Sequence, residues 1–404
     1  MVTEAEIRIL QVVGNLERGG GQEVVRTLVR NLLEVGVSPV VASLADGPLR
    51  AEIEASGVPV VVVRGRTRSI LKGPPAMREF AMIRHGLLEV ARTHRTSVVQ
   101  THLLRSLDFL ALTLRWDPQV VAVFWTIHNA LLDLRADQLP GRQWLLGPKR
   151  AAHRALYRIG GRTVDAFIAV SADVGANVRA SYRPSPGRLI VIPNGVDTER
   201  YGPAFARHET RQGIGIPAHV PLAIVVAKLM TQKGHEVLLD ALPSVLEQFP
   251  ELHTVLVGDG ELRDSLEGRV RNTGLAGRVA FLGNRPDIPA LLAASDLFVL
   301  PSLWEGLPMA LLEAMASGLP VVATAVSGTR DVVQSDRSGV LVAPGNAQAL
   351  AEGMTKVLAD ASFASSLGDA ARARVEDCYS ARAQALRHAQ LYRSRLNIAE
   401  GGGN

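Results

Sequence analysis

Cysteine, aromatic residues and long apolar runs are scarce in this sequence. The single cysteine among 404 residues, Cys378, excludes an internal disulfide and a cysteine-based metal cluster. Aromatic residues make up only 4% of the chain, so its cores have to be built from Val, Leu, Ala and Ile. No stretch approaches the roughly 18 apolar residues of a membrane-spanning helix. The N-terminal MVTEAEIRILQVV is acidic before its first apolar run, unlike a secretory signal. We therefore expect a cytoplasmic protein.

Motifs for several kinds of site are also missing. The chain contains no H-E-x-x-H motif and no Asp-x-Asp pair, so we expect no bound metal and no cofactor. It lacks the G-x-G-x-x-G fingerprint and the acidic residue about 20 positions further on, which argues against a dinucleotide-dependent oxidoreductase. The basic half lacks interleaved aromatic residues, and we expect no nucleic-acid partner.

Charge is unevenly distributed along the chain. The first 195 residues hold 25 Lys and Arg against 16 Asp and Glu, whereas the remainder holds 19 against 23. This asymmetry indicates different partners for the two halves, or a solvated surface with an accidental imbalance.

Short apolar runs alternate with helix-length segments in both halves. The first half has such runs in IRILQVV, VSPVVASLA, VVQTH, VFWTIH and DAFIAV; the second half has PLAIVVAKL, HTVLVGDG, RVAFLGN, DLFVLPS and PVVATAV. This alternation predicts an α/β protein with two Rossmann-like, doubly wound parallel-sheet domains. We place them at 1–190 and 191–378, with a C-terminal helix at 379–404 that packs back on the first. Because ligands bind at the carboxyl ends of parallel strands, the two sheets are expected to face a cleft.

Two glutamates stand out in PSLWEGLPMALLEAMASG. Glu305 falls in a predicted strand-to-helix loop, and Glu313 falls about one and a half turns into the helix. Solvated positions are the simplest interpretation for both. However, apolar neighbours surround Glu313 on nearly every side, where an unpaired carboxylate is costly. Two carboxylates at this place would seek hydrogen-bond donors, such as the hydroxyls of a diol.

Other polar residues and glycines also follow predicted strands. Lys228 and Lys233 share one post-strand loop and would form a compact positive site for phosphate, unless both are simply solvated. The glycines at 19–21 allow a close approach of backbone to a ligand, although on their own they are a weak signal. His102 and His128 each end a predicted strand, and a structural role for them is as common as a functional one.

Together these residues resemble the retaining glycosyltransferases of family 4, which have the two-domain GT-B fold. EGLPMALLE resembles the family's E-x7-E signature, AKLMTQKG its R-x4-K-G element, and VIPNGVD its interdomain strand and turn. In the first half, GGQEVV resembles the Gly-Gly-x-Glu turn, and VVQTH and TIHN resemble two His-ended strands. The resemblance covers nearly the whole chain.

The resemblance implies a role for each matching residue. Glu305 would hold hydroxyls of the transferred sugar and, with His128 in the sugar pocket, would be catalytic. Glu313 would bind the ribose diol, and Lys228 and Lys233 would neutralise the diphosphate without a metal.

The remaining positions complete the implied site. The other donor-binding residues would be Gly20, Gly21, Leu282, Arg285, Gly306, Leu307, Pro308 and Met309, with Leu282 and Arg285 near the base. Gln22 and His102 would lie on the acceptor side.

Two departures from the family pattern concern this site. Lys228 stands where an arginine is commoner, which removes bidentate contact with phosphate. VSGTRDVV, with Ser327 and Asp331, replaces the usual Gly-Gly-x-Pro-Glu loop.

The implied function is a metal-independent, retaining transfer of sugar from a UDP- or GDP-sugar to a hydroxyl of a glycan, a glycolipid or a small molecule. One alternative is a sugar-nucleotide epimerase on the same fold. Another is a non-catalytic subunit that binds nucleotide sugars. The sequence specifies neither the donor base nor the acceptor.

A basic segment in the first half predicts a further partner. Residues 64–95 hold ten Lys, Arg and His against two Glu. After Pro75, Met77, Phe80, Met82, Ile83, Leu87 and Val90 recur at near-helical spacing. Either this helix faces a core with a solvated basic side, or it rests reversibly on an anionic membrane, at the inner face of the cell membrane, where a lipid-linked acceptor would lie.

Overall fold

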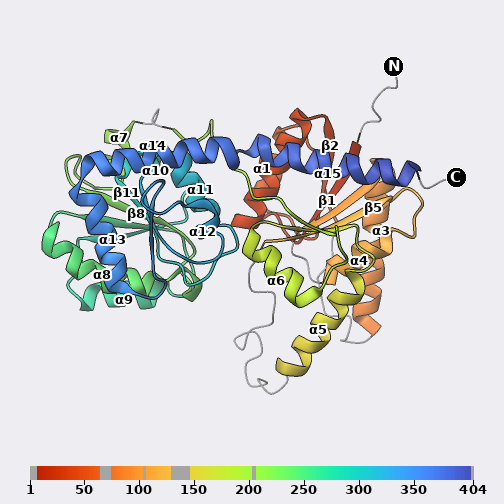
Figure 1. Cartoon of the computed structure of the whole chain (residues 1–404), viewed down its shortest axis with the longest axis horizontal. Helices are drawn as coiled ribbons and strands as arrows, with labels where there is room; N and C mark the ends of the chain where they lie inside the picture. Colours follow the sequence, from red (N-terminus) through yellow and green to blue (C-terminus); the bar gives the residue numbers. More distant parts are fainter. Residues whose placement is uncertain (1–6, 64–73, 103–105, 129–145, 203–205, 402–404) are drawn as a thin grey trace. The chain divides into compact units, whose positions relative to one another are not determined.

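A computed structural model of the chain divides into two compact units. The first comprises residues 1–195 and 381–404, and the second comprises Val196–Ser380. The structure describes all residues except 1–6, 64–73, 103–105, 129–145, 203–205 and 402–404 (Figure 1). Each unit is built on one parallel β-sheet with helices packed around it, which confirms the predicted fold class.

The first unit contains a seven-stranded parallel sheet in the order β3-β2-β1-β4-β5-β6-β7. Its strands are β1 (Ile7–Val13), β2 (Val37–Ser43), β3 (Val60–Val62), β4 (Val98–His102), β5 (Ala122–Ile127), β6 (Ala166–Ala169) and β7 (Leu189–Val191). Its helices are α1 (Gly20–Glu34), α2 (Leu49–Ala55), α3 (Pro74–Thr93), α4 (Ser106–Leu114), α5 (Leu146–Gly160), α6 (Ala172–Tyr182) and α15 (Ala381–Gly401).

The second unit contains a six-stranded parallel sheet in the order β10-β9-β8-β11-β12-β13. Its strands are β8 (Leu222–Val226), β9 (His253–Val257), β10 (Val279–Gly283), β11 (Leu297–Leu300), β12 (Val321–Thr324) and β13 (Val340–Val342). Its helices are α7 (Arg207–Gly213), the 3₁₀ helix η4 (Thr231–Lys233), α8 (His235–Gln248), α9 (Arg263–Asn272), α10 (Ile288–Ala294), α11 (Met309–Ala316), α12 (Thr329–Val332), α13 (Ala347–Ala359) and α14 (Ala361–Cys378).

The C-terminal helix completes the core of the first unit. α15 packs against α1 (Figure 1). Its Ala385, Ala389 and Tyr392 are buried with apolar side chains of β1, β4 and β5. Small alanines on α15 let the helix approach the sheet closely, while Tyr392 fills the remaining space between them.

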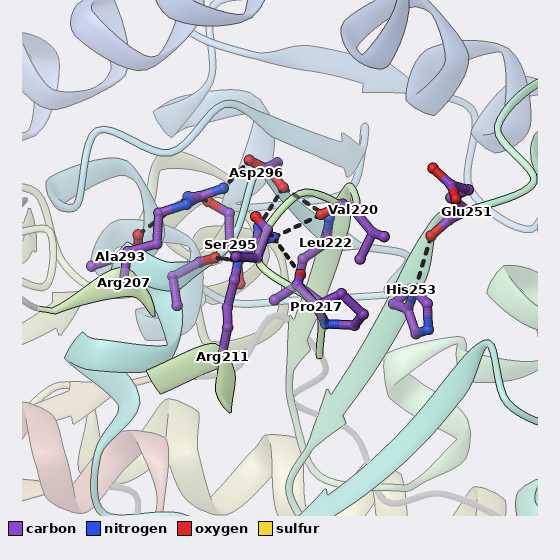
Figure 2. A network of polar contacts seen from close by, with 12 residues as sticks. Arg207, Arg211, Pro217, Val220, Leu222, Glu251, His253, Ala293, Ser295 and Asp296 are labelled. Atoms are coloured by element: carbon purple, nitrogen blue, oxygen red, sulfur yellow. Dashed lines mark hydrogen bonds and ion pairs between the residues drawn. The ribbon is translucent and has the colours of Figure 1, made fainter. Parts of the chain in front are cut away.

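A buried arginine ties together the beginning of the second unit. The side chain of Arg211 in α7 is 1% exposed. Its guanidinium donates to main-chain carbonyl oxygens within 3.5 Å, those of Ala294, Pro217, Ala218 and Val220 (Figure 2). It also pairs with Asp296 at 2.7 Å. Because its N–H groups find acceptors, the buried charge is compensated and links α7 to the α10–β11 junction.

The predicted basic helix exists as α3, and its apolar residues divide between two environments. Ile83, Leu87 and Val90 are buried in the first unit, as expected of a core-facing helix. Met77 and Met82 are each 62% exposed. Residues 64–73, which carry much of the predicted basic charge, lie outside the described part of the chain. Over the residues that are described, no helix is long and apolar enough to cross a membrane.

Candidate functional site

The second unit brings the loops after β8 and β11 together at the carboxyl edge of its sheet. The main-chain N–H of Leu303 donates to the carbonyl oxygen of Gln232 at 2.8 Å. The side-chain amide of Gln232 donates to the carbonyl oxygen of Trp304 at 2.9 Å. These two bonds join the loop that carries Lys233 to the loop that carries Glu305.

Two glycines allow these loops to pack closely. Gly234 has a φ of +64°, and a Cβ built on it would lie 2.0 Å from the carbonyl oxygen of Pro301. Gly328, after β12, has a φ of +76°, and its Cβ would lie 2.0 Å from the carbonyl oxygen of Gly306. A side chain at either position would push the loops apart. The close approach of Gly328 to Gly306 also means that the VSGTRDVV segment, which differs from the family pattern, packs directly against the Glu305 loop.

Glu305 and Lys233 form an ion pair at the centre of this site. Lys233 Nζ donates to Glu305 Oε1 at 2.5 Å, and Ser302 Oγ donates to the same oxygen at 2.7 Å. The Glu305 side chain is 5% exposed, whereas that of Lys233 is 19% exposed. The structure thus joins two residues for which the sequence predicted separate contacts, with sugar and with diphosphate.

The burial expected for the two glutamates is wrong. Glu305, the loop residue, is the buried one, and Glu313 is half-exposed. On α11, Leu311, Leu312 and Ala314 are buried, whereas Glu313 between them is only partly buried. Apolar sequence neighbours therefore did not mean an apolar environment, because adjacent helical residues point to different sides.

The N-terminus of α11 supplies hydrogen-bond donors beside Glu305. Gly306, Leu307, Pro308 and Met309 are all buried and lead into the helix. Pro308 occupies the N-cap and makes no side-chain hydrogen bond that would cap the helix. The main-chain N–H groups of the first turn, beginning with Met309, are therefore available to polar oxygens of a ligand.

The other predicted donor residues differ in their surroundings. Lys228 is exposed and has no ion pair with a described residue, whereas Lys233 is half-buried and paired with Glu305. Leu282 is half-buried on β10, an edge strand of the sheet. Arg285 pairs with Asp287 at 2.7 Å; this hydrogen bond raises the pKa of Arg285 and lowers that of Asp287.

Two polar groups in this unit are buried without a described partner, and only one of them, His235, was not singled out from the sequence. His235 opens α8 beside Lys233, and neither of its ring nitrogens has a hydrogen-bond partner among the described residues. Burial lowers the pKa of His235 to about 4, and the charge of Lys233 acts in the same direction. Ser327 Oγ is likewise buried without a described partner, whereas the main-chain oxygen of Asp331 accepts from Tyr379.

In the first unit, the glycine turn begins α1. A Cβ built on Gly20 or Gly21 meets no atom within 4 Å, and neither residue has a positive φ. The fold of this unit therefore gives no reason for glycine at these positions. The side chain of Gln22 donates to Asn15 Oδ1 at 2.8 Å, which closes the turn after β1.

The two strand-ending histidines lie next to each other. His102 Nδ1 and His128 Nε2 are 3.1 Å apart, and both side chains are almost fully buried. Burial lowers the pKa of His128 to about 4 and that of His102 well below its usual value. Both imidazoles are therefore neutral at pH 7.

A chain of buried amides continues from these histidines, and sequence analysis did not identify it. Gln11, Gln100 and Tyr392 are each fully buried and hydrogen-bonded within the first unit. A polar residue inside an otherwise apolar strand, as in IRILQVV and VVQTH, was the available signal.

Comparisons with known proteins place the whole chain in a family. A family model described as Glycosyltransferase Family 4 matches residues 18–200, and one described as Glycosyl transferases group 1 matches residues 206–374. These matches confirm the resemblance inferred from the motifs.

Two curated relatives illustrate the similarity. The UDP-Gal:alpha-D-GlcNAc-diphosphoundecaprenol alpha-1,3-galactosyltransferase of Escherichia coli is 38% identical over 39% of this chain and 42% of its own length. A GDP-mannose-dependent alpha-(1-6)-phosphatidylinositol monomannoside mannosyltransferase of Mycolicibacterium smegmatis is 31% identical over 62% of this chain and 67% of its own length. Across the first three relatives, the matched region spans 42, 56 and 57% of the relative, about half its length.

Solved structures agree with the fold over nearly the whole chain. Anabaena HepE in complex with UDP-glucose matches with a TM-score of 0.79 and 21% identity, over 96% of this chain and 100% of HepE. A glycosyltransferase from Rickettsia africae matches with a TM-score of 0.79 and 20% identity, over 97% of this chain and 99% of the other. At these identities the likeness supports the GT-B fold alone.

Proposed function

Because this chain belongs to the family 4, group 1 glycosyltransferases, we propose that it transfers a sugar from a nucleotide-diphosphate sugar to a hydroxyl acceptor. The observation that carries the proposal is the Lys233–Glu305 pair beside the N-terminus of α11. A cation for a leaving diphosphate, a buried carboxylate for sugar hydroxyls and main-chain donors are gathered at one sheet edge.

The proposed reaction needs no metal at this site. The acceptor oxygen forms a bond to the anomeric carbon while the bond from that carbon to the diphosphate oxygen breaks. The diphosphate leaves with the bonding electrons and takes the acceptor's proton. Lys233 and the first-turn N–H groups of α11 stabilise the negative charge that develops on it. Transfer on the same face retains the anomeric configuration.

The donor is proposed to be a UDP- or GDP-sugar. The names of the two relatives above specify UDP-Gal for one and GDP-mannose for the other. Arg285 and Leu282, at the end of β10, are the proposed neighbours of the base. Because Arg285 is already paired with Asp287, its guanidinium is held in place before a ligand arrives.

Product analysis separates this proposal from its two alternatives. The protein would be incubated with UDP- and GDP-sugars, with and without lipid-linked or glycan acceptors, in EDTA. Release of nucleoside diphosphate with a new glycoside of retained configuration is expected. Interconversion of free sugar nucleotides would instead indicate an epimerase, and binding without turnover would indicate a non-catalytic subunit. A rate that collapses in EDTA and returns with manganese would contradict the metal-free site.

A surface of the first unit supports a lipid-linked acceptor. Trp116 is 76% exposed, and the guanidinium of Arg84 lies 5.3 Å from the centroid of its ring. Met82 on α3 and Ile159 on α5 are further exposed apolar side chains of this unit, at 62 and 65%. Exposed apolar side chains beside arginine are the combination that binds anionic membrane surfaces, with each basic residue contributing up to about 1 kcal/mol.

Vesicle cosedimentation tests this part of the proposal. Binding to anionic phospholipid vesicles is expected at low salt and release at high salt. Replacing Met82 and Trp116 with serine should weaken binding without changing nucleotide affinity. Leu386→Ser, which alters an apolar side chain of α15 that is 40% exposed, is the matched control. Absence of vesicle binding at low salt would favour a soluble acceptor.

A further inference from the structure

A line of buried polar side chains crosses three neighbouring strands of the first unit. Gln11 on β1, Gln100 on β4 and Thr126 on β5 lie on the face of the sheet that α15 covers. His102 and His128 extend this line at the carboxyl ends of β4 and β5. On the same face, the preceding side chains of these strands are apolar. Polar groups are thus confined to the end of the sheet where ligands bind.

The hydrogen bonds along this line form a single chain with a definite direction. Tyr392 Oη donates to Gln100 Oε1, and Gln100 Nε2 donates to Thr126 Oγ1 at 2.7 Å. Gln11 Nε2 donates to Tyr392 Oη at 3.4 Å. The carbonyl oxygen of the Gln11 side chain is therefore directed toward the histidines.

The orientation of Gln11 decides where the imidazole protons are. Gln11 Oε1 lies 2.6 Å from His102 Nε2, and an oxygen can only accept, so His102 carries its proton on Nε2. Its Nδ1 then has a lone pair and accepts from His128 Nε2 at 3.1 Å. A neutral His128 with a proton on Nε2 has a bare Nδ1. This Nδ1 is buried and has no partner among the described residues.

We propose that Gln11, His102 and Tyr392 are positioning residues that hold His128 in the Nε2-protonated tautomer, so that its Nδ1 accepts a hydrogen bond from a substrate hydroxyl. This inference rests on the proposed function for the identity of the hydroxyl, which belongs to the transferred sugar or its acceptor. A lone pair fixed on His128 Nδ1 accepts a hydrogen bond from a donor group of the ligand and repels an acceptor group of the ligand. The site then favours a ligand with a free hydroxyl there over a deoxy or O-methyl analogue.

This chain of hydrogen bonds also explains why the hydroxyl of Tyr392, on the C-terminal helix α15, is buried. Tyr392 is fully buried, yet its hydroxyl is placed between two strand amides rather than among apolar side chains. Without that hydroxyl, Gln11 Nε2 and Gln100 Oε1 both lose a partner, and the Gln11 amide is free to rotate. A rotated amide would present Nε2 to His102 and reverse both histidine tautomers. Through Tyr392, α15 thereby influences the tautomer of His128, the residue that follows β5.

Nitrogen-15 NMR of the histidine side chains in the full-length protein tests the tautomer without any assay of activity. In protein labelled at histidine, the two-bond proton–nitrogen spectrum at pH 7.5 distinguishes protonated from bare ring nitrogens. The signals of His128 are assigned by their loss in His128→Gln. We expect Nε2 of both His128 and His102 to be protonated and both Nδ1 atoms to be bare. A proton on Nδ1 of His128, or a doubly protonated ring, would overturn the proposal.

Three variants test what holds the tautomer. Gln11→Leu removes the acceptor that faces His102 and should give mixed tautomers. Tyr392→Phe should give partial mixing. Tyr157→Phe is the matched control, because it removes another buried tyrosine hydroxyl of the first unit, one that donates to Asp108 at 2.7 Å. Unchanged spectra in both Gln11→Leu and Tyr392→Phe would refute the positioning role.

Kinetics connect the tautomer to catalysis and keep the two proposals distinguishable. Gln11→Leu should lower kcat about ten-fold, the effect of one hydrogen bond, with little change in the donor KM. Tyr157→Phe should leave both kcat and the donor KM unchanged. If the spectra are as expected but no sugar is transferred from any donor, the proposed function fails and the tautomer assignment stands. If transfer occurs while Gln11→Leu leaves kcat unchanged, the positioning role fails alone.

Discussion

The ion pair between Lys233 and Glu305 makes a prediction that separates ligand binding from folding. In the structure, the carboxylate that would hold the sugar neutralises the lysine that would hold the diphosphate. A diphosphate must therefore compete with Glu305 for Lys233. Glu305→Gln removes the competitor while keeping the size of the side chain and a carbonyl acceptor for Ser302.

The magnitude follows from burial on the two sides of the pair. Lys233→Ala would leave the Glu305 carboxylate, 5% exposed, with Ser302 as its one remaining partner among those described, and should cost about 3 kcal/mol of stability. Glu305→Gln leaves a lysine that is 19% exposed and can turn toward water, so about 1–3 kcal/mol is expected. The double variant removes both charges. Its cost should be below the sum of the single costs by about 1–3 kcal/mol.

Urea unfolding of the four proteins gives this coupling, and titration calorimetry gives the affinity for UDP and GDP. We expect Glu305→Gln to keep or tighten nucleoside diphosphate binding while lowering kcat by about 10²-fold or more. Lys233→Ala should weaken the diphosphates but leave the nucleosides, uridine and guanosine, unaffected.

Three results would count against this reasoning. Single costs that add within about 0.5 kcal/mol would show that the pair contributes nothing beyond its separate charges. A clear loss of nucleoside diphosphate affinity in Glu305→Gln would contradict competition for Lys233. Equal loss of nucleoside and nucleoside diphosphate binding in Lys233→Ala would make that lysine structural.

Further changes test other parts of the molecule. Glu313→Gln should weaken nucleoside binding by about 1–3 kcal/mol if Glu313 binds the ribose diol, as calorimetry would measure. Lys228→Ala should weaken diphosphate binding less than Lys233→Ala does, because Lys228 is exposed. Gly20→Ala should leave the melting temperature unchanged, since the added methyl meets nothing in the protein. It should raise the donor KM, because the glycine is proposed to let the backbone approach the donor closely. Burial lowers the pKa of His388 from 6.5 to about 4, so the unfolded chain takes up a proton at this histidine at a higher pH than the folded chain does. The stability measured by urea unfolding should therefore fall as the pH drops from about 6.5 toward 4. The fall should be less steep in His388→Gln.

The fold could be predicted because its signal is local and repeated. Each buried parallel strand is a short apolar run, and each helix-length segment between runs has to cross over one face of the sheet. The sequence therefore specified two parallel-sheet units without any knowledge of their contacts. It also placed candidate residues after strands, where Lys233 and Glu305 are found at one sheet edge.

Burial at the site could not be predicted in the same way. Glu305 is buried because Gly234 and Gly328 let neighbouring loops close over it, and those glycines lie far from it in sequence. Glu313 stays partly exposed although its sequence neighbours are apolar, since adjacent helical residues point to different sides of α11. The pattern of sequence neighbours indicates the surroundings of a strand or a helix well. The surroundings of a loop residue depend on which other loops meet at the same edge of the sheet.

The chain of hydrogen bonds from Tyr392 to His128 shows the same limit over a long sequence separation. Gln11 and Tyr392 are 381 positions apart, and neither residue alone differs from an ordinary buried amide or tyrosine. Their significance arises from direction: the Gln11 side chain donates only through its amide nitrogen and accepts only through its carbonyl oxygen, so placing the nitrogen at Tyr392 directs the oxygen to His102. That commitment passes to His128 only because β4 and β5 are adjacent in the sheet. A polar residue in an apolar strand thus signals that a partner exists, whereas the partner and the direction of the bond follow only from the tertiary structure.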